Sequence, residues 1–390
     1  MFASRAMMSI GMILIGVQFF LKKDLAETFR LYYRDKILFL LSFIFLIYLI
    51  SIFNTEHIDD FWPRLTIKLP LLFMPLGFAA LKEMPVKYFQ HILYAFLLFA
   101  LITAAISVAM YIMHYQEITE SYKSAKVIPN IFGISHIRFS LMLVTACFSA
   151  LYLFRQEYFL IKKGEKYLIA FAGIFILAFI HLLSVRSGLL AFYATAFAMV
   201  ASRMIIFRQY LTGAILLLFI LLAPFLAYQS IPTVRNKVDY MVTDVSRFLQ
   251  GKNVNRWSDG NRLLSLQIGI ELGKEHLLTG IGAGDVEKDM AVYYEKYHPE
   301  ISKENHLIPH SQFVYVFTAC GLIGLIIFTI VTFYPFFLRT TYYSELFLAV
   351  NVIILTSYIS EATLENQLGV CLLVTFYLIG WQTKKMPDTR

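Results

Sequence analysis

The sequence predicts an all-α, polytopic integral membrane protein, and three observations lead to this fold class. Hydrophobic residues make up 58% of the 390 residues, above the roughly 45–50% that is usual in soluble domains. The mean hydropathy is +0.65. The apolar residues also gather in long runs, and a helix needs a run of about 20 to cross a bilayer core about 30 Å thick.

These runs predict about eleven membrane-spanning helices, or twelve if another helix precedes the short first one. The expected spans cover residues 5–21, 37–53, 65–81, 88–113, 132–154, 167–185, 187–202, 209–228, 311–338, 343–360 and 366–382. The sixth and seventh spans are expected to form a tight hairpin around Arg186.

The distribution of positive charge predicts which side of the membrane each loop faces. Lys and Arg gather in alternate loops, for example at Lys22 and Lys23 and in the C-terminal Lys384 and Lys385. Cytoplasmic loops are enriched in Lys and Arg, so these loops are expected in the cytoplasm and the N-terminus outside. An external N-terminus on so short a span indicates that a first helix is missing or that the start codon is misplaced. Membrane topology also accounts for the net charge of +8, so no nucleic-acid partner is expected.

One polar segment, residues 229–310, interrupts the apolar pattern on the external side. It holds about a third of the charged residues in about a fifth of the chain. Apolar spacing predicts a helix over 261–278, ended by the glycines of "GIGAG", and a second helix over 285–297. The chain is therefore expected to have three parts. These are N-terminal transmembrane helices in 1–228, a large helical external loop in 229–310, and C-terminal transmembrane helices in 311–390.

The stretch "NHLIPHSQF", residues 305–313, lies where the polar segment meets the next apolar run. Pro309 is favoured in a first helical turn, where its missing N–H costs nothing, so it predicts a helix that starts near residue 310. The positive end of the helix dipole would keep His310 neutral, as a general base must be, and would favour a nearby anion. The alternative is an interfacial histidine that caps the helix end.

A zinc site is not expected, although His306 and His310 have the spacing of two metal ligands. Pro309 prevents a continuous helix, residue 307 is Leu rather than Glu, and no third ligand is evident in the sequence. The acidic run at 285–289 fits a solvated helix start better than a metal site. The sequence therefore predicts neither a metal nor a cofactor.

Ionisable residues inside the expected spans are a second sign of function. A charge at mid-bilayer costs at least about 2.5–3.5 kcal/mol, so such residues mark function or a paired interior. Several lie in the external halves of their spans: Lys68, His136, Arg138, His181 and Arg186. A long side chain that reaches back to the surface accounts for Lys68, but less well for Arg138, roughly 9 Å below the surface by helical rise. These cations predict a site for an anionic, membrane-embedded headgroup such as a lipid diphosphate.

Three motifs together resemble the O-antigen ligase and polymerase superfamily of membrane glycosyltransferases. "SVRSG" around Arg186 is similar to a small-Arg-small motif at an external helix end. Arg262, followed by an amphipathic helix and "GIGAGD", is similar to part of the family's large loop. "HSQFVYVFTACGLIGLIIF", from His310, resembles the signature that opens the next span, with Ser311 where Asn is common. The resemblance covers roughly residues 180–330.

The resemblance implies a GT-C-like fold and metal-independent, inverting transfer of a glycan from undecaprenyl diphosphate to an acceptor hydroxyl. It implies that His310 is catalytic and that Arg186 and Arg262 bind the diphosphate, while Arg138 and His306 are further substrate-binding candidates from position alone. The implied partners are an undecaprenyl-diphosphate-linked glycan, membrane lipid, and lipid A core or a growing glycan as acceptor. The implied location is the bacterial inner membrane, with the active site on the periplasmic face.

Three functions stay open at this point. An O-antigen ligase would join the glycan to lipid A core, and a polymerase would extend the glycan on its carrier by the same chemistry. A transporter for the same lipid would need a pathway but no general base, so the role of His310 separates it from the two enzymes.

Overall fold

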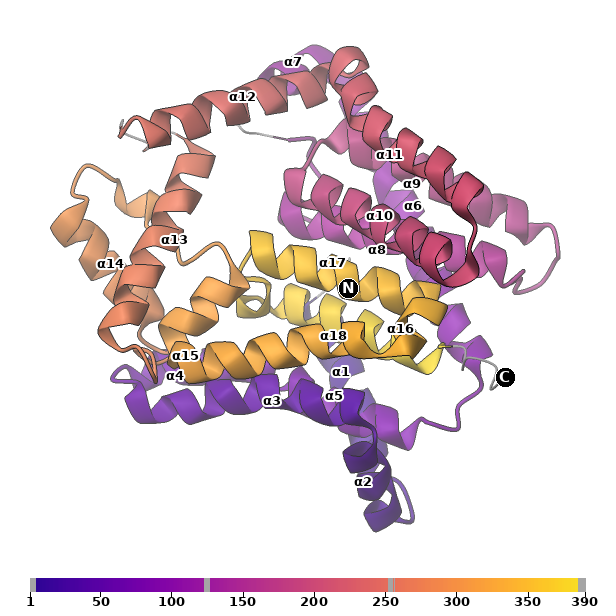
Figure 1. The fold of residues 1–390 in the computed structure, drawn as a ribbon, viewed down its shortest axis with the longest axis horizontal. Helices are drawn as coiled ribbons and strands as arrows, with labels where there is room; N and C mark the ends of the chain where they lie inside the picture. The colour runs from indigo at the N-terminus through magenta and orange to yellow at the C-terminus, as the bar shows by residue number, and fades with distance from the viewer. Residues whose placement is uncertain (1–4, 123–126, 252–254, 256, 385–390) are drawn as a thin grey trace.

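The computed structural model describes residues 5–122, 127–251, 255 and 257–384, and these residues form helices and no strand (Figure 1). The all-α class is therefore confirmed for this part of the chain. Most helices pack into one bundle, and three polar helices lie along one edge of it (Figure 1).

The first half of the chain forms the following helices: α1 (Arg5–Phe20), α2 (Leu25–Arg34), α3 (Lys36–Ile50), η1 (Ser51–Asn54), α4 (Ile58–Lys68), α5 (Pro70–Ala80), α6 (Val86–Met113), α7 (Tyr115–Ser121), α8 (His136–Arg155), α9 (Glu165–Leu183), α10 (Arg186–Phe207) and α11 (Tyr210–Ser230). The second half forms α12 (Pro232–Leu249), α13 (Ser258–Glu275), α14 (Val286–Tyr297), η3 (Lys303–Asn305), α15 (Gln312–Phe333), η4 (Tyr334–Phe337), α16 (Arg339–Tyr343), α17 (Glu345–Ser360), η5 (Thr363–Glu365) and α18 (Gln367–Gln382).

Seven of the described helices are long and apolar enough to cross a membrane, or up to eight if a bent pair counts as one span. The seven are α3 with η1, α6, α8, α9, α10, α11, and α15 with η4. The number and hydropathy of the described helices are thus consistent with a polytopic membrane protein. At the other four expected spans the helices are shorter or broken: α1 and α2 bend by 113°, Pro70 starts α5 directly after α4, and α17 and α18 have 16 residues each.

Helix α8 lies at the centre of one group of helices, and α11 lies on the outside. The most apolar stretch of α8 is 78% buried, with α6, α9, α10 and α17 packed around it. The corresponding stretch of α11 is 6% buried and exposes large residues such as Phe219 and Leu221. An apolar helix exposed in this way is what lipid contact requires, whereas polar residues on α8 and α10 can face the protein interior.

The described residues of the polar segment between α11 and α15 contain three α-helices, where the sequence predicted two, and the short 3-10 helix η3. The predicted helices over 261–278 and 285–297 correspond to α13 and α14, so these two predictions are confirmed within a few residues. The third helix, α12, was missed although Val234, Val238, Met241, Val245 and Phe248 recur at helical spacing, because the segment around this stripe is mostly polar. It begins with Pro232, the residue favoured at a first helical position.

The glycine turn after α13 docks against a break in α15. At Gly321 the backbone has φ +65°, which interrupts the helical hydrogen bonds. The N–H groups of Leu322 and Ile323 donate instead to the carbonyls of Leu277 and Leu278, at 2.8 and 3.3 Å. In return, the Thr318 and Ala319 carbonyls accept the N–H groups of Ile281 and Gly282, at 2.9 and 3.0 Å. The "GIGAG" turn is thus used in joining two helices rather than in cradling a ligand.

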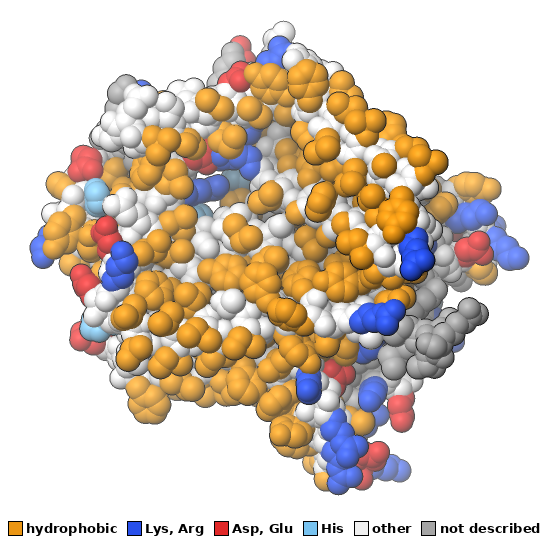
Figure 2. Space-filling view, viewed as in Figure 1, with side chains coloured by type: hydrophobic (Ala, Val, Ile, Leu, Met, Phe, Trp, Pro, Cys, Tyr) orange, Lys and Arg blue, Asp and Glu red, His pale blue; other side chains and the backbone are white. Residues whose placement is uncertain are grey.

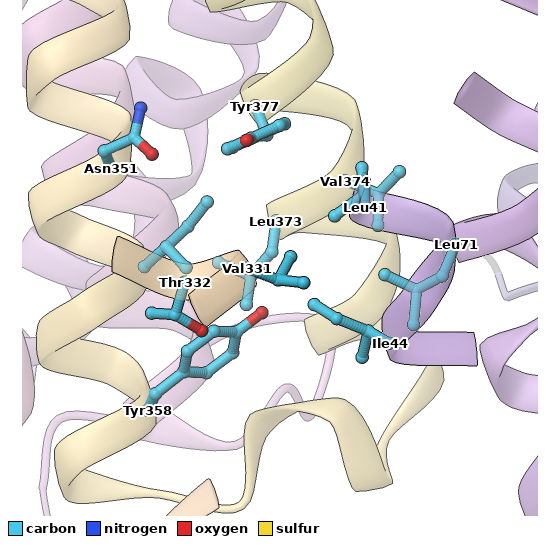
Figure 3. Close-up of a pocket in the computed structure, with 11 residues that line it drawn as sticks. Leu41, Ile44, Leu71, Val331, Thr332, Asn351, Tyr358, Leu373, Val374 and Tyr377 are labelled. Carbon is cyan, nitrogen blue, oxygen red and sulfur yellow. The ribbon is translucent and has the colours of Figure 1, made fainter. Parts of the chain in front are cut away.

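A small cavity lies among α3, α15, α17 and α18, lined mainly by apolar side chains such as Leu41 and Leu373 (Figure 3). Its volume is about 20 Å³, room for about one water molecule. It is too small for a sugar or a lipid headgroup, so the substrate site must lie elsewhere.

Candidate active site

His310 lies at the start of α15, but outside the helix. The helix begins at Gln312 with Ser311 as N-cap, in an extended conformation. The prediction that Pro309 starts the helix and that His310 lies in its first turn is therefore wrong. The physical reason is that the His310 N–H donates to Ser265 Oγ on α13, at 3.3 Å, and Ser265 Oγ donates to the carbonyl of Arg262, at 2.7 Å. His310 is thereby tied to the turn of α13 that carries Arg262.

The residues after His310 join the start of α15 to the connection between α17 and α18. Ser311 Oγ donates to the carbonyl of Tyr358 at 3.2 Å. The side-chain carbonyl of Gln312 accepts the N–H of Leu364 at 2.6 Å. These two contacts span the last turn of α17, so the first residue after that helix, Glu361, is brought against His310.

Glu361 lies between His310 and Arg138. One carboxylate oxygen is 3.6 Å from His310 Nδ1 and the other is 3.7 Å from an Arg138 guanidinium nitrogen. The exposed fractions of the three side chains are only 11–19%. Burial by itself would raise the pKa of Glu361, but the nearby His310, Arg138 and Arg262 lower it overall. Glu361 is therefore an ionised carboxylate beside the histidine.

Arg138 lies nearer the helix end than the sequence predicted. Helix α8 begins at His136 rather than at residue 132, so Arg138 is in the first turn and not two turns inside a span. The "NIFG" sequence before α8 explains the late start, because Asn130 closes a turn onto Ile134 with two side-chain bonds, at 2.7 and 2.9 Å.

Arg186 and Arg262 meet in a second part of the site, which we call the cationic pocket: His136, Arg186, Lys237 and Arg262 around a cavity of about 90 Å³. These residues come from α8, α10, α12 and α13. Figure 2 shows a hollow in this region, below α12, in which Lys, Arg and His side chains gather. The expectation that Arg186 and Arg262 lie together agrees with this arrangement.

Acidic residues on α12 and α13 hold the two arginines in place. Arg186 is the first residue of α10, where the helix dipole disfavours a cation, and it forms an ion pair with Asp259. Asp244, fully buried on α12, accepts the N–H groups of Asp259 and Gly260 at 2.6 and 2.9 Å. A carboxylate on one helix thus caps the next helix, one turn before Arg262.

The charges of the cationic pocket are only partly balanced. Burial, followed by the charge of Arg186, lowers the pKa of Lys237 to about 8. Burial and Arg186 likewise lower the pKa of Arg262. Burial is the largest cause of both shifts, and Asp259 and Asp244 oppose it only in part, so binding of a multiply charged anion in the pocket is electrostatically favourable.

His306 lies apart from both groups of residues. Its ring stacks on Tyr294, with centroids 4.6 Å apart and planes 9° apart, and its Nε2 lies 3.2 Å from the carbonyl of Ile301. These contacts fit a structural residue of the α14 connection. The expected role of His306 in substrate binding stays a prediction that the contacts described for it do not support.

Lys68 does not reach back to a membrane surface, so that interpretation is wrong. Its side chain is fully buried and its Nζ lies 2.8 Å from a Glu365 carboxylate oxygen. Tyr48 donates to the other oxygen of Glu365 at 2.7 Å, and Gln312 donates to the Tyr48 hydroxyl at 2.9 Å. This buried network, which includes the residue two positions after His310, supports the start of α15.

Glu361, Lys237 and Asp259 are the site residues that sequence reasoning missed. A weak signal existed for the first, because "SEATLENQ" places two carboxylates in a short connection between apolar runs. Acids in such a position need nearby cations. Nothing in the spacing of Lys237 or Asp259 distinguishes them from the other charges of the polar segment.

The fold and site together define an all-helical membrane protein with a cationic pocket next to a histidine and a buried carboxylate. Residues 171–329 of the chain match the family model described as O-antigen ligase. No match was found among curated proteins. The matched residues run from α9 to the second half of α15 and contain Arg186, Arg262 and His310, whereas Arg138 and Glu361 lie outside them. The resemblance to the O-antigen ligase and polymerase superfamily is thus confirmed over these residues.

Proposed function

We propose that this protein is an O-antigen ligase that transfers a glycan from undecaprenyl diphosphate to a hydroxyl of lipid A core, without metal and with inversion. The observation that carries the proposal is the link between His310 and Arg262 through Ser265, which sets a base next to a pocket of cations. The family match over residues 171–329 supports the general reaction class.

The cationic pocket would bind the diphosphate of the donor. As the bond between the sugar and the diphosphate breaks, negative charge develops on the leaving phosphate oxygen. Arg186 and Arg262 can each donate two N–H bonds to phosphate oxygens, and Lys237 adds a third positive charge. This arrangement supplies the charge that a metal ion provides in other glycosyl transfers, so the proposed reaction needs none.

His310 would act as the general base. Its ring takes the proton of the acceptor hydroxyl, the acceptor oxygen forms a bond to the anomeric carbon, and the diphosphate leaves with the electron pair on the opposite side. A single displacement of this kind inverts the anomeric centre. The proton then passes from the imidazolium to the leaving diphosphate or to water.

The site is proposed to face the periplasm of a bacterial inner membrane, in a GT-C-like fold. This assignment rests on the positive charges of the opposite loops, including Lys22, Lys23 and the residues of α2. It also matches the donor chemistry, because a prenyl chain would stay in lipid while its headgroup reaches the cationic pocket.

A transfer assay with purified protein and an undecaprenyl-diphosphate oligosaccharide tests this function. We expect His310→Ala to abolish transfer, while His114→Ala, at an exposed histidine on another helix end, keeps wild-type activity. Arg262→Ala is expected to lower transfer by roughly 10²–10³-fold, with Arg235→Ala, at an exposed arginine of α12, as its control. Transfer that survives His310→Ala would overturn the enzyme assignment and favour a transporter.

Ligase and polymerase share the donor and differ in the acceptor, so the lipopolysaccharide of a deletion strain separates them. Loss of all attached O-antigen on a gel is expected for a ligase. A single attached repeat would instead identify a polymerase, with the same roles for His310 and the cationic pocket.

A further inference from the structure

Glu361 lies beside His310, the base of the proposed reaction, and is held there by contacts far from the cationic pocket. The connection that carries it is joined to α15 by Ser311 and Gln312 and to α4 by the buried pair of Lys68 and Glu365. The backbone N–H of Glu361 also donates a hydrogen bond to the carbonyl of Ser357, at 2.9 Å. The position of Glu361 is therefore set by the fold rather than by a flexible loop.

Two buried atoms in this contact have no hydrogen-bond partner among the described residues: His310 Nδ1 and Glu361 Oε2. They face each other at 3.6 Å. A buried polar atom without a partner is costly, and here a shift of about 0.7 Å from the 3.6 Å separation would give a hydrogen bond of ordinary length, about 2.9 Å. The geometry is that of a carboxylate about to accept the Nδ1–H of a neutral imidazole.

We propose, on the basis of the proposed function, that Glu361 is a positioning residue. It holds His310 with Nδ1 protonated and leaves Nε2 free to take the proton of the acceptor hydroxyl. Once His310 has taken that proton, the same carboxylate stabilises the imidazolium. Arg138, on the other carboxylate oxygen, keeps Glu361 ionised, so the proton stays on His310. The pair works as in other enzymes in which a carboxylate orients a histidine base.

The charged and titratable groups that face Glu361 come from three elements: His310 from the start of α15, Arg138 and His136 from α8, and Arg262 from α13. Of the two histidines, which titrate nearest neutral pH, His310 is the one whose ring nitrogen lies 3.6 Å from the carboxylate. A pH effect of replacing Glu361 therefore reports on His310.

Kinetics of Glu361→Gln test the inference. We expect kcat to fall by roughly 10- to 10,000-fold, with the donor KM within about twofold of wild type because the cationic pocket is intact. The acidic limb of the pH–rate profile should move to lower pH, since the imidazolium loses its anionic partner. Glu361→Asp should recover part of kcat, and Glu304→Gln, at an exposed glutamate of η3, should change nothing.

The tautomer of His310 gives a second measurement that does not depend on activity. Spectra of ¹⁵N-histidine-labelled full-length protein, with the signal assigned by its loss in His310→Ala, should show Nδ1 protonated in wild type and a mixture in Glu361→Gln. A wild-type kcat and pH profile in Glu361→Gln, or Nε2 protonated in the wild type, would overturn the inference. A wild-type protein that transfers no glycan but shows the expected tautomer would overturn the proposed function alone.

Discussion

Asp244 on α12 accepts the backbone N–H of Asp259 at 2.6 Å, and Asp259 in turn pairs with Arg186 on α10. The polar segment is thereby bound to the membrane helices through the residues that surround the cationic pocket. A change at a carboxylate that touches no substrate should thus alter donor binding.

Asp244→Ala tests this connection. Removal of a capping carboxylate costs about 0.5–2 kcal/mol, and here it leaves the N–H groups of Asp259 and Gly260 without their acceptor. We expect a lower thermal unfolding midpoint in detergent and a higher donor KM. Asp239→Ala, at an exposed aspartate on the same helix, is the matched control. Equal effects of the two substitutions would contradict the capping role.

The donor KM should depend on pH through Lys237. Below its pKa of about 8 the ammonium is charged and attracts the diphosphate, and above that pH the charge is lost. The donor KM is therefore expected to rise as the pH increases through about 8 and beyond, as measured by initial rates from about pH 6.5 to about pH 9.5.

Lys237→Arg should flatten this pH dependence, because a guanidinium stays charged over the whole range. Lys303→Arg, at an exposed lysine of η3, should leave it unchanged. A donor KM that falls with rising pH in the wild type would contradict the assignment.

Lys68 and Glu365 should be coupled in stability. Removing one member of a buried ion pair leaves an unpaired charge and costs about 3–5 kcal/mol. Lys68→Met is therefore expected to lower the unfolding midpoint strongly, and Lys68→Met combined with Glu365→Gln should recover part of the loss. The measurement is a double-mutant cycle from thermal unfolding in detergent. Additive losses in the double variant would show that the pair is not coupled.

Gly321→Ala should destabilise the junction between α13 and α15. A Cβ at this position would lie 2.4 Å from the Leu278 carbonyl group, and the backbone φ is +65°. Gly133 has φ +59° and open space around it, so Gly133→Ala measures only the cost of a side chain at positive φ, about 1–2 kcal/mol. Gly321→Ala is expected to cost more than Gly133→Ala in thermal unfolding, and equal costs would show that the contact with Leu278 yields easily.

Glycan transfer should persist in EDTA, because the proposed chemistry relies on guanidinium and ammonium groups. The assay compares initial rates with and without the chelator after dialysis. A rate that is lost in EDTA and restored by an added divalent ion would contradict the metal-free reaction.

Hydropathy predicted the positions of the seven long apolar helices among the described residues, because a bilayer imposes a length and a composition that can be read residue by residue. At the other four expected spans the helices are shorter or broken. Helices α13 and α14 were also predicted, since their ends carry glycine and proline signals. Helix α12 was not, although Val234, Val238, Met241, Val245 and Phe248 recur at helical spacing, because this stripe lies in a mostly polar segment.

The site was predicted in part for a similar reason. Arg186, Arg262 and His310 belong to local motifs within the family-matched residues. Glu361 does not, and its contact with His310 depends on how α15 packs beside the end of α17 through Ser311 and Gln312. Such long-range pairing has no local signature. The first-turn position of Arg138 was missed for a different reason, the local turn that Asn130 closes onto Ile134 before α8.

The break at Gly321 means that α15 is not one continuous rod. The turn after α13 holds both halves, because Ile281 and Gly282 donate to the first half and the carbonyls of Leu277 and Leu278 accept from the second. The first half is mostly buried, whereas the second half exposes Ile323, Ile326 and Ile330. When membrane thickness changes, spanning helices adapt mainly by tilting. A tilt of the second half of α15 would then be passed through Leu277 and Leu278 to α13, the helix that carries Arg262 and Ser265. We therefore expect the reaction geometry to respond to the lipid composition around it.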